Sequence, residues 1–163
     1  MKPTDLVALL QECYRDRLAL AEHHRAVAVH VPGYDINNTY QYVINREETH
    51  LEWLAAALAD LGASLPAPPD GPSLTIQRGK DAWRPLVQED AKRGQAFVAS
   101  WSPRVEALSH ARDQTMLRLM LGEMQEQTRL LEQALSGEPN LLGRDGTGAG
   151  QRGVVAGTRW MGD

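Results

Sequence analysis

Two short pairs of ionisable residues, 76 positions apart, carry the side chains of this chain best suited to metal chemistry. Glu47 and His50 form a Glu-x-x-His pair, and Glu123 and Glu126 form a Glu-x-x-Glu pair. Residues three positions apart lie close together on one face of a helix. Carboxylates combined with imidazole suit iron or manganese better than they suit soft metals. The spacing therefore predicts that each pair presents its groups to one site.

Both pairs lie in segments whose apolar residues recur at helical spacing. Glu47 is at the centre of the first apolar stripe, with His50 beside it, and Glu123 is at the centre of the second. An unpaired carboxylate in an apolar core costs several kcal/mol, so each needs a metal, an Arg or a shared proton as partner. The first stripe comprises Val43, Leu51, Leu54, Leu58 and Leu61, and the second comprises Met116, Leu119, Met120, Leu130 and Ala134.

Four helical segments are expected to position these residues. They cover approximately residues 4–30, 38–61, 81–101 and 111–135, and Ser102-Pro103 is expected to end the third and restart the chain. Residues 62–80 contain three Gly and four Pro and are predicted to be a loop. Almost no segment alternates as a strand would. The fold class is therefore all-α.

The long loop determines the expected topology. A simple up-down-up-down bundle needs only short loops, whereas residues 62–80 can run the length of a helix. We therefore expect two antiparallel hairpins joined by a crossover. The second and third helices then begin at the same end, which places core-facing Asp90 level with Glu47 and Glu123. Three acids and one histidine are predicted to meet midway along the bundle.

This pattern resembles the ferritin-like superfamily, of the bacterioferritin and rubrerythrin type, over about residues 4–136. In that superfamily the first and third helices each give a carboxylate, and the second and fourth each give a Glu-x-x-His. Glu47-x-x-His50 matches the second-helix motif, and Asp90 takes the third-helix position. The resemblance implies a metal site formed by Glu47, His50, Asp90, Glu123 and Glu126. This site would hold iron, as a di-iron centre or a single metal, or Mn. The activity that the resemblance implies is that of a di-iron-type oxidoreductase.

The ligand set nevertheless departs from the family pattern. Glu126 stands where the second histidine belongs, and the first helix has no carboxylate at the matching height. That helix instead directs Arg17 and His24 inward, whereas the adjacent His23 is expected to be solvated. The alternative is a metal-free structural or interaction module in which Arg17 neutralises the buried acids, with Asp90 a candidate partner. A third class, a bundle with three histidines on one metal, matches less well.

Composition sets broad limits on class and location. The 17 basic and 21 acidic residues give a net charge of −4, which argues against nucleic acid as the main partner. The single Cys13 excludes an internal disulfide and fits a reducing compartment. We find no signal peptide at the N-terminus and no apolar run long enough to span a membrane. These features predict a cytoplasmic protein with no membrane partner.

The last part of the chain differs in composition from the rest. We expect a domain of residues 1–136 followed by a Gly-rich tail at 137–163, and residues 143–163 contain seven Gly. The tail ends in Arg159, Trp160 and Met161, and Trp and Arg often anchor interfaces. Trp160 is therefore predicted to dock on the same bundle, on another subunit of a homo-oligomer, or on another protein.

Overall fold

The structure is a computed structural model that describes residues 3–138 and 141–142, so the predicted tail at 143–163 lies outside the described residues. Four long helices account for most of the described chain. They are α1 (Pro3–Ala28), α2 (Tyr34–Asp60), α3 (Trp83–Glu106) and α4 (Ala111–Ser136). No strand occurs among the described residues. The all-α class predicted from the sequence is confirmed.

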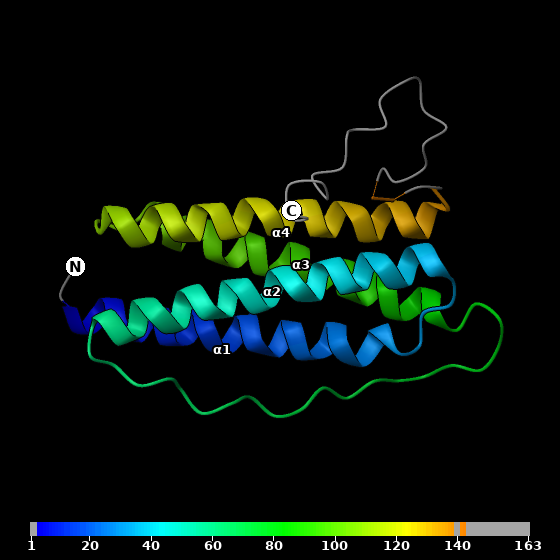
Figure 1. The fold of residues 1–163 in the computed structure, drawn as a ribbon, viewed down its shortest axis with the longest axis horizontal. Coiled ribbons are helices and arrows are strands. Elements are labelled where there is room, and N and C mark those ends of the chain that lie inside the picture. Colours follow the sequence, from blue (N-terminus) through cyan, green and yellow to red (C-terminus); the bar gives the residue numbers. More distant parts are fainter. Residues whose placement is uncertain (1–2, 139–140, 143–163) are drawn as a thin grey trace, which may run out of the picture.

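The helices form two antiparallel hairpins, α1 with α2 and α3 with α4. The hairpins pack through α1 against α3 and through α2 against α4. The segment between Asp60 and Trp83 runs along the whole bundle, so that α2 and α3 begin at the same end (Figure 1). The side chain of Gln11 holds the start of this segment through a 2.8 Å hydrogen bond to the carbonyl of Ser64. The predicted crossover topology is confirmed.

Two apolar clusters fill the two ends of the bundle, and a layer of polar residues lies between them, about midway along the helices. The larger cluster includes Leu10, Leu58 and Trp101, and the smaller includes Val27 and Leu131. Each fully buried Leu or Val contributes about 1.5–3 kcal/mol, so these clusters provide the main drive for folding. The buried polar and charged residues between them include Arg17, His24, Glu47, His50, Asp90 and Gln127.

Two sequence-based expectations about the helices are wrong. α3 does not end before Pro103 but continues through it to Glu106, and Ser102 donates 2.7 Å to the carbonyl of Val98 instead of capping a new helix. Pro103 has no N–H to bond to the carbonyl of Ala99, so α3 passes through it with one ladder bond fewer in its last turn. On α4 the expected apolar stripe is rotated, since Leu119 is 53% exposed whereas Leu117 and Met124 are buried.

The α3–α4 pair contains a close contact at Gly94. A Cβ atom at this position would lie 2.5 Å from the hydroxyl oxygen of Thr128. Thr128 is itself held by a 2.9 Å hydrogen bond to the carbonyl of Met124. Gly94 therefore sets how near the two helices can approach.

Replacing Gly94 by Ala should lower the free energy of unfolding by about 1–3 kcal/mol, because the new methyl group must push Thr128 away. The matched control is Gly122→Ala on α4, where nothing lies within 4 Å of the added Cβ. This control should gain about 0.5–1 kcal/mol from helix propensity. Urea unfolding followed by circular dichroism measures both. If both variants are more stable than wild type, the contact at Gly94 does not limit packing.

Candidate functional site

Glu47 on α2 is the central acid of the polar layer. Its Oε1 atom accepts hydrogen bonds of 2.7 Å from Nη1 of Arg17 and 2.7 Å from Nδ1 of His24, both on α1. Arg17 and Glu47 are completely buried, and His24 is nearly so. A buried ion pair is stable only when its remaining hydrogen-bonding groups also find partners. Nη2 of Arg17 finds partners in His50 and Gln127, whereas Nε of Arg17 and Oε2 of Glu47 have none.

His50 lies one turn beyond Glu47 and extends the network toward α4. Its Nδ1 is 3.2 Å from Nη2 of Arg17, and its Nε2 is 2.8 Å from Oε2 of Glu123. Because a guanidinium only donates, Nδ1 must accept and Nε2 must carry the proton. Burial, together with the neighbouring charge of Arg17, lowers the pKa of His50 to about 4. His50 is therefore a neutral bridge between Arg17 and Glu123.

Glu123 closes the network at the edge of the bundle. Its Oε2 accepts a 2.9 Å hydrogen bond from Nε of Arg46 and its Oε1 accepts a 2.5 Å hydrogen bond from Nη2, a bidentate pair that bridges α2 and α4. The side chain of Glu123 is 26% exposed. Burial raises the pKa of Glu123, but the hydrogen bonds from Arg46 and His50 outweigh it and hold the pKa below its ordinary value. Glu123 is therefore an ionised, half-buried end point of the network.

Asp90 on α3 has a separate set of partners. Its Oδ1 is 2.5 Å from Nδ1 of His23, and its Oδ2 accepts a 2.5 Å hydrogen bond from the hydroxyl of Tyr40. The Nε2 of His24 is 3.7 Å from Oδ1 of Asp90, which joins this group to the Glu47 side of the layer. Burial, followed by the nearby Asp90 charge, raises the pKa of Tyr40, so its phenol stays protonated and donates.

His24 and Glu47 stabilise each other's charged forms. Burial by itself lowers the pKa of His24, but the charges of Glu47 and Asp90 and the hydrogen bond to Glu47 raise it above its ordinary value. For Glu47, burial raises the pKa, and the contacts with His24 and Arg17 reverse this and lower it. When His24 is protonated, three cations (Arg17, Arg46 and His24) face the carboxylates of Glu47, Asp90 and Glu123.

The structure thus brings together four of the five residues predicted to form the site. Glu47, His50, Asp90 and Glu123 are linked through Arg17 and His24. Glu126 is not part of this group, because it is exposed and pairs with Arg129 at 2.9 Å on its own helix. The predicted inward orientation of Arg17 and His24 is confirmed.

Three sequence-based expectations about individual side chains are wrong. His23 is buried, with 4% exposure, because its ring reaches back to Asp90. Asp90 is bonded to His23 and Tyr40 and has no hydrogen bond or ion pair with Arg17. Glu123 is not at the centre of a buried stripe, because the buried face of α4 is rotated toward Met124 and Gln127.

Sequence reasoning also missed the role of Arg46. It lies next to Glu47 and, by helical periodicity, points away from the apolar stripe of α2. The structure shows its long side chain reaching Glu123 on α4 and lying 5.9 Å from the Trp53 ring. The only indication in the sequence was a basic residue directly before a buried acid. This pattern does not show which helix the basic side chain contacts.

The residues around Arg17 do not fit a di-metal centre. Within the described ranges, no group of three or more His, Cys, Asp and Glu side chains is arranged to hold a metal ion. The guanidinium already contacts both members of the Glu-x-x-His motif. Two atoms that could bind a cation, Oε2 of Glu47 and Nε2 of His24, have no hydrogen-bond partner, but they belong to side chains already paired through other atoms.

Nucleophilic chemistry at Cys13 is not favoured either. Its thiol is buried in the larger apolar cluster. Burial raises the pKa of Cys13 to about 12, so the reactive thiolate is scarce at neutral pH. Cys13 is a packing residue.

In the described part of the chain, no helix is both long and apolar enough to cross a membrane.

The lowered pKa of His50 gives a testable pH dependence. In the folded protein His50 is neutral down to about pH 4, whereas in the unfolded chain it takes up a proton near pH 6.5. Its stabilising contribution is therefore complete above pH 6.5 and is lost as the pH falls toward 4, a loss of up to about 3 kcal/mol. The raised pKa of His24 has the opposite sign, and its contribution is lost as the pH rises through the folded pKa.

We expect His50→Gln to flatten the stability profile between these two pH values. A Gln side chain can accept from Arg17 and donate to Glu123 without titrating. The control is His30→Gln, because His30 is exposed beyond the end of α1. Urea unfolding of chelator-treated protein across the range measures the profiles. Parallel profiles for wild type and His50→Gln would show that another group causes the loss.

Comparison with known proteins gives a result at the level of structure. No protein-family model and no curated protein matches the sequence. Among solved structures, a mutant of Dps1 from Mycobacterium smegmatis matches 82% of this chain and 96% of its own, with 16% identity and a TM-score of 0.60. A ferritin-like, diiron-carboxylate protein from Bacillus anthracis strain Ames matches 83% of this chain and 99% of its own, with 17% identity and a TM-score of 0.52. The chain therefore has the ferritin-like fold.

Proposed function

We propose that this protein is a ferritin-like structural or interaction module whose centre is neutralised by Arg17 instead of a metal. One observation carries the proposal. The guanidinium of Arg17, completely buried, lies 2.7 Å from Glu47 and 3.2 Å from His50, the two residues of the Glu-x-x-His motif. A cation that cannot lose its proton in a protein therefore stands beside the groups that would otherwise attract a metal.

Electrostatics explains why Arg17 and a divalent ion would compete for this place. Two unit charges 4 Å apart interact by about 4 kcal/mol at an effective dielectric constant of 20, and a divalent ion doubles this. A metal bound to Glu47 would be repelled by Arg17 to that extent. It would also compete with His24, which already donates a hydrogen bond to Glu47. Arg17 already donates to Oε1 of Glu47 and to His50 without it.

Binding of iron or manganese between the helices is the second candidate function, and one observation favours it. Oε2 of Glu47 and Nε2 of His24 are buried without hydrogen-bond partners, and both are atoms that transition metals bind when His24 is neutral. This function requires Arg17 to leave the centre of the bundle. One of the similar structures is described as a diiron-carboxylate protein, which makes the test worthwhile.

Removal of the Arg17 charge tests the proposed function. Arg17→Met keeps an apolar stem but leaves Glu47 with only His24, so the free energy of unfolding should fall by about 3–5 kcal/mol. The matched control is Arg46→Met, which breaks the partly exposed pair with Glu123 and should cost at most about 1 kcal/mol. The double variant Arg17→Met with Glu47→Gln should recover part of the loss.

Metal content distinguishes the two candidates. Wild-type protein from cells supplied with iron and manganese should contain well below one equivalent of either metal by elemental analysis. One equivalent or more in the wild type, lost in both Glu47→Ala and His50→Ala, would contradict the proposal and establish metal binding. Equal stability of wild type and Arg17→Met would contradict the neutralising role of Arg17 whatever the metal content.

A further inference from the structure

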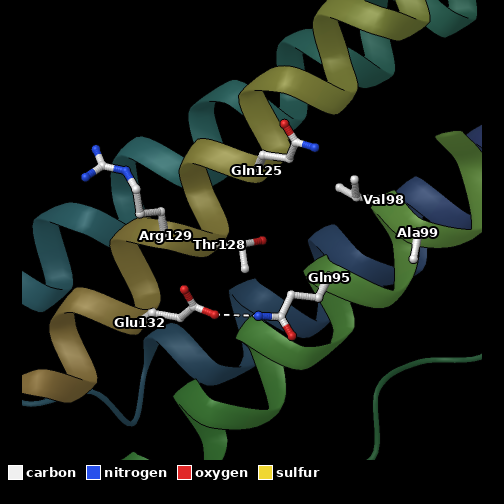
Figure 2. A pocket seen from close by; sticks show the side chains of 7 residues that line it. All are labelled: Gln95, Val98, Ala99, Gln125, Thr128, Arg129 and Glu132. Carbon is white, nitrogen blue, oxygen red and sulfur yellow. Dashed lines mark hydrogen bonds between the residues drawn. The ribbon is translucent and has the colours of Figure 1, made fainter.

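A shallow groove lies on the outer side of the α3–α4 hairpin, close to the Gly94 contact. Figure 2 shows the side chains that line it, from α3 on one side and α4 on the other. Its volume is about 330 Å³. This is the lower end of the range for ligand sites, so the groove suits one large side chain better than an extended ligand. The lining residues are Gln95, Val98, Ala99, Gln125, Thr128, Arg129 and Glu132.

The groove combines an apolar floor with one uncompensated charge on its rim. Val98, Ala99 and the methyl group of Thr128 supply apolar surface. On the rim, Arg129 is already paired with Glu126. Glu132 accepts a hydrogen bond from Gln95 but has no ion pair within the described part of the chain. An apolar floor beside a carboxylate that has no cation partner among the described residues fits an aromatic residue with a neighbouring cation.

The C-terminal sequence of this chain carries such a pair, and its distance along the chain from the groove can be bounded. α4 ends at Ser136, and Thr128 lies eight residues earlier, about 12 Å along the helix. Trp160 lies 17 positions beyond Gly143, a length that can span up to roughly 60 Å. Arg159 directly precedes Trp160. The segment 143–163, which lies outside the described residues, can therefore reach the groove from the adjacent end of α4.

We propose that Trp160 of the C-terminal segment occupies the α3–α4 groove of its own bundle, with Arg159 facing Glu132. A Trp side chain buries on the order of 150–250 Å² of surface, and Trp and Arg are the residues that most often dominate interfaces. A covalent tether gives an effective concentration in the mM range. Weak intrinsic binding therefore suffices, and this inference does not depend on the metal content of the bundle.

A mutant cycle in the full-length protein tests the docking. Ala99→Arg fills the groove from an exposed helix position, and Trp160→Ala removes the occupant. Each single variant should lower the melting temperature by about 2–4 °C, the shift that loss of 1 kcal/mol produces in a chain of this size. The melting temperature of the double variant should be no lower than that of either single variant, because both substitutions remove the same contact. Ala96→Arg, on the same helix outside the groove, is the matched control and should leave the melting temperature unchanged.

Fluorescence supplies a second measurement that does not depend on stability. The difference between the emission of wild type and Trp160→Phe isolates Trp160, and we expect it to be blue-shifted in wild type and in Ala96→Arg but solvent-like in Ala99→Arg. Solvent-like emission in wild type, or additive losses in the cycle, would overturn the proposal. A blue shift that disappears on dilution would also overturn it and would assign the segment to the groove of a second copy.

Discussion

A buried cation and a buried anion meet midway along the four-helix bundle, and the rest of the polar layer is arranged around them. Arg17 and Glu47 are both completely shielded from water. Each charge alone would cost several kcal/mol in this place, so each strongly stabilises the other. His24 and His50 take up further hydrogen-bonding groups of the pair, and Gln127 lies 3.4 Å from the guanidinium. Every helix adjoining the pair is constrained by it.

This layer also gives the bundle a defined register. Apolar side chains can repack among themselves at small cost, as interiors tolerate changes that preserve volume. Hydrogen-bonded side chains cannot repack at small cost, because each needs a partner at a short distance and a suitable angle. A shift of α2 by one turn would separate Glu47 from Arg17 and Arg46 from Glu123 at once. We infer that the layer selects one alignment of the helices between the two apolar clusters.

The resemblance of this chain to solved structures is one of fold and not of sequence. The solved structures that resemble this chain share only 16% and 17% of its residues, yet the resemblance extends over 82% and 83% of its length. Helix length, apolar faces and the crossover are sufficient to specify the bundle, and they allow many choices of central side chain. Function is decided by those choices and not by the fold. In this chain the choice of Arg17 beside a Glu-x-x-His motif is the informative one.

Helical periodicity in the sequence determined the four helices and the inward orientation of Arg17, His24 and Glu47, and the length of the 62–80 loop determined the crossover. Periodicity relates a side chain only to the apolar face of its own helix. The partner of that side chain depends on how neighbouring helices are rotated and on how far long side chains reach. Only the tertiary structure could therefore show that His23 turns inward to Asp90 and that Arg46 draws Glu123 to the edge, because these contacts join helices distant in sequence.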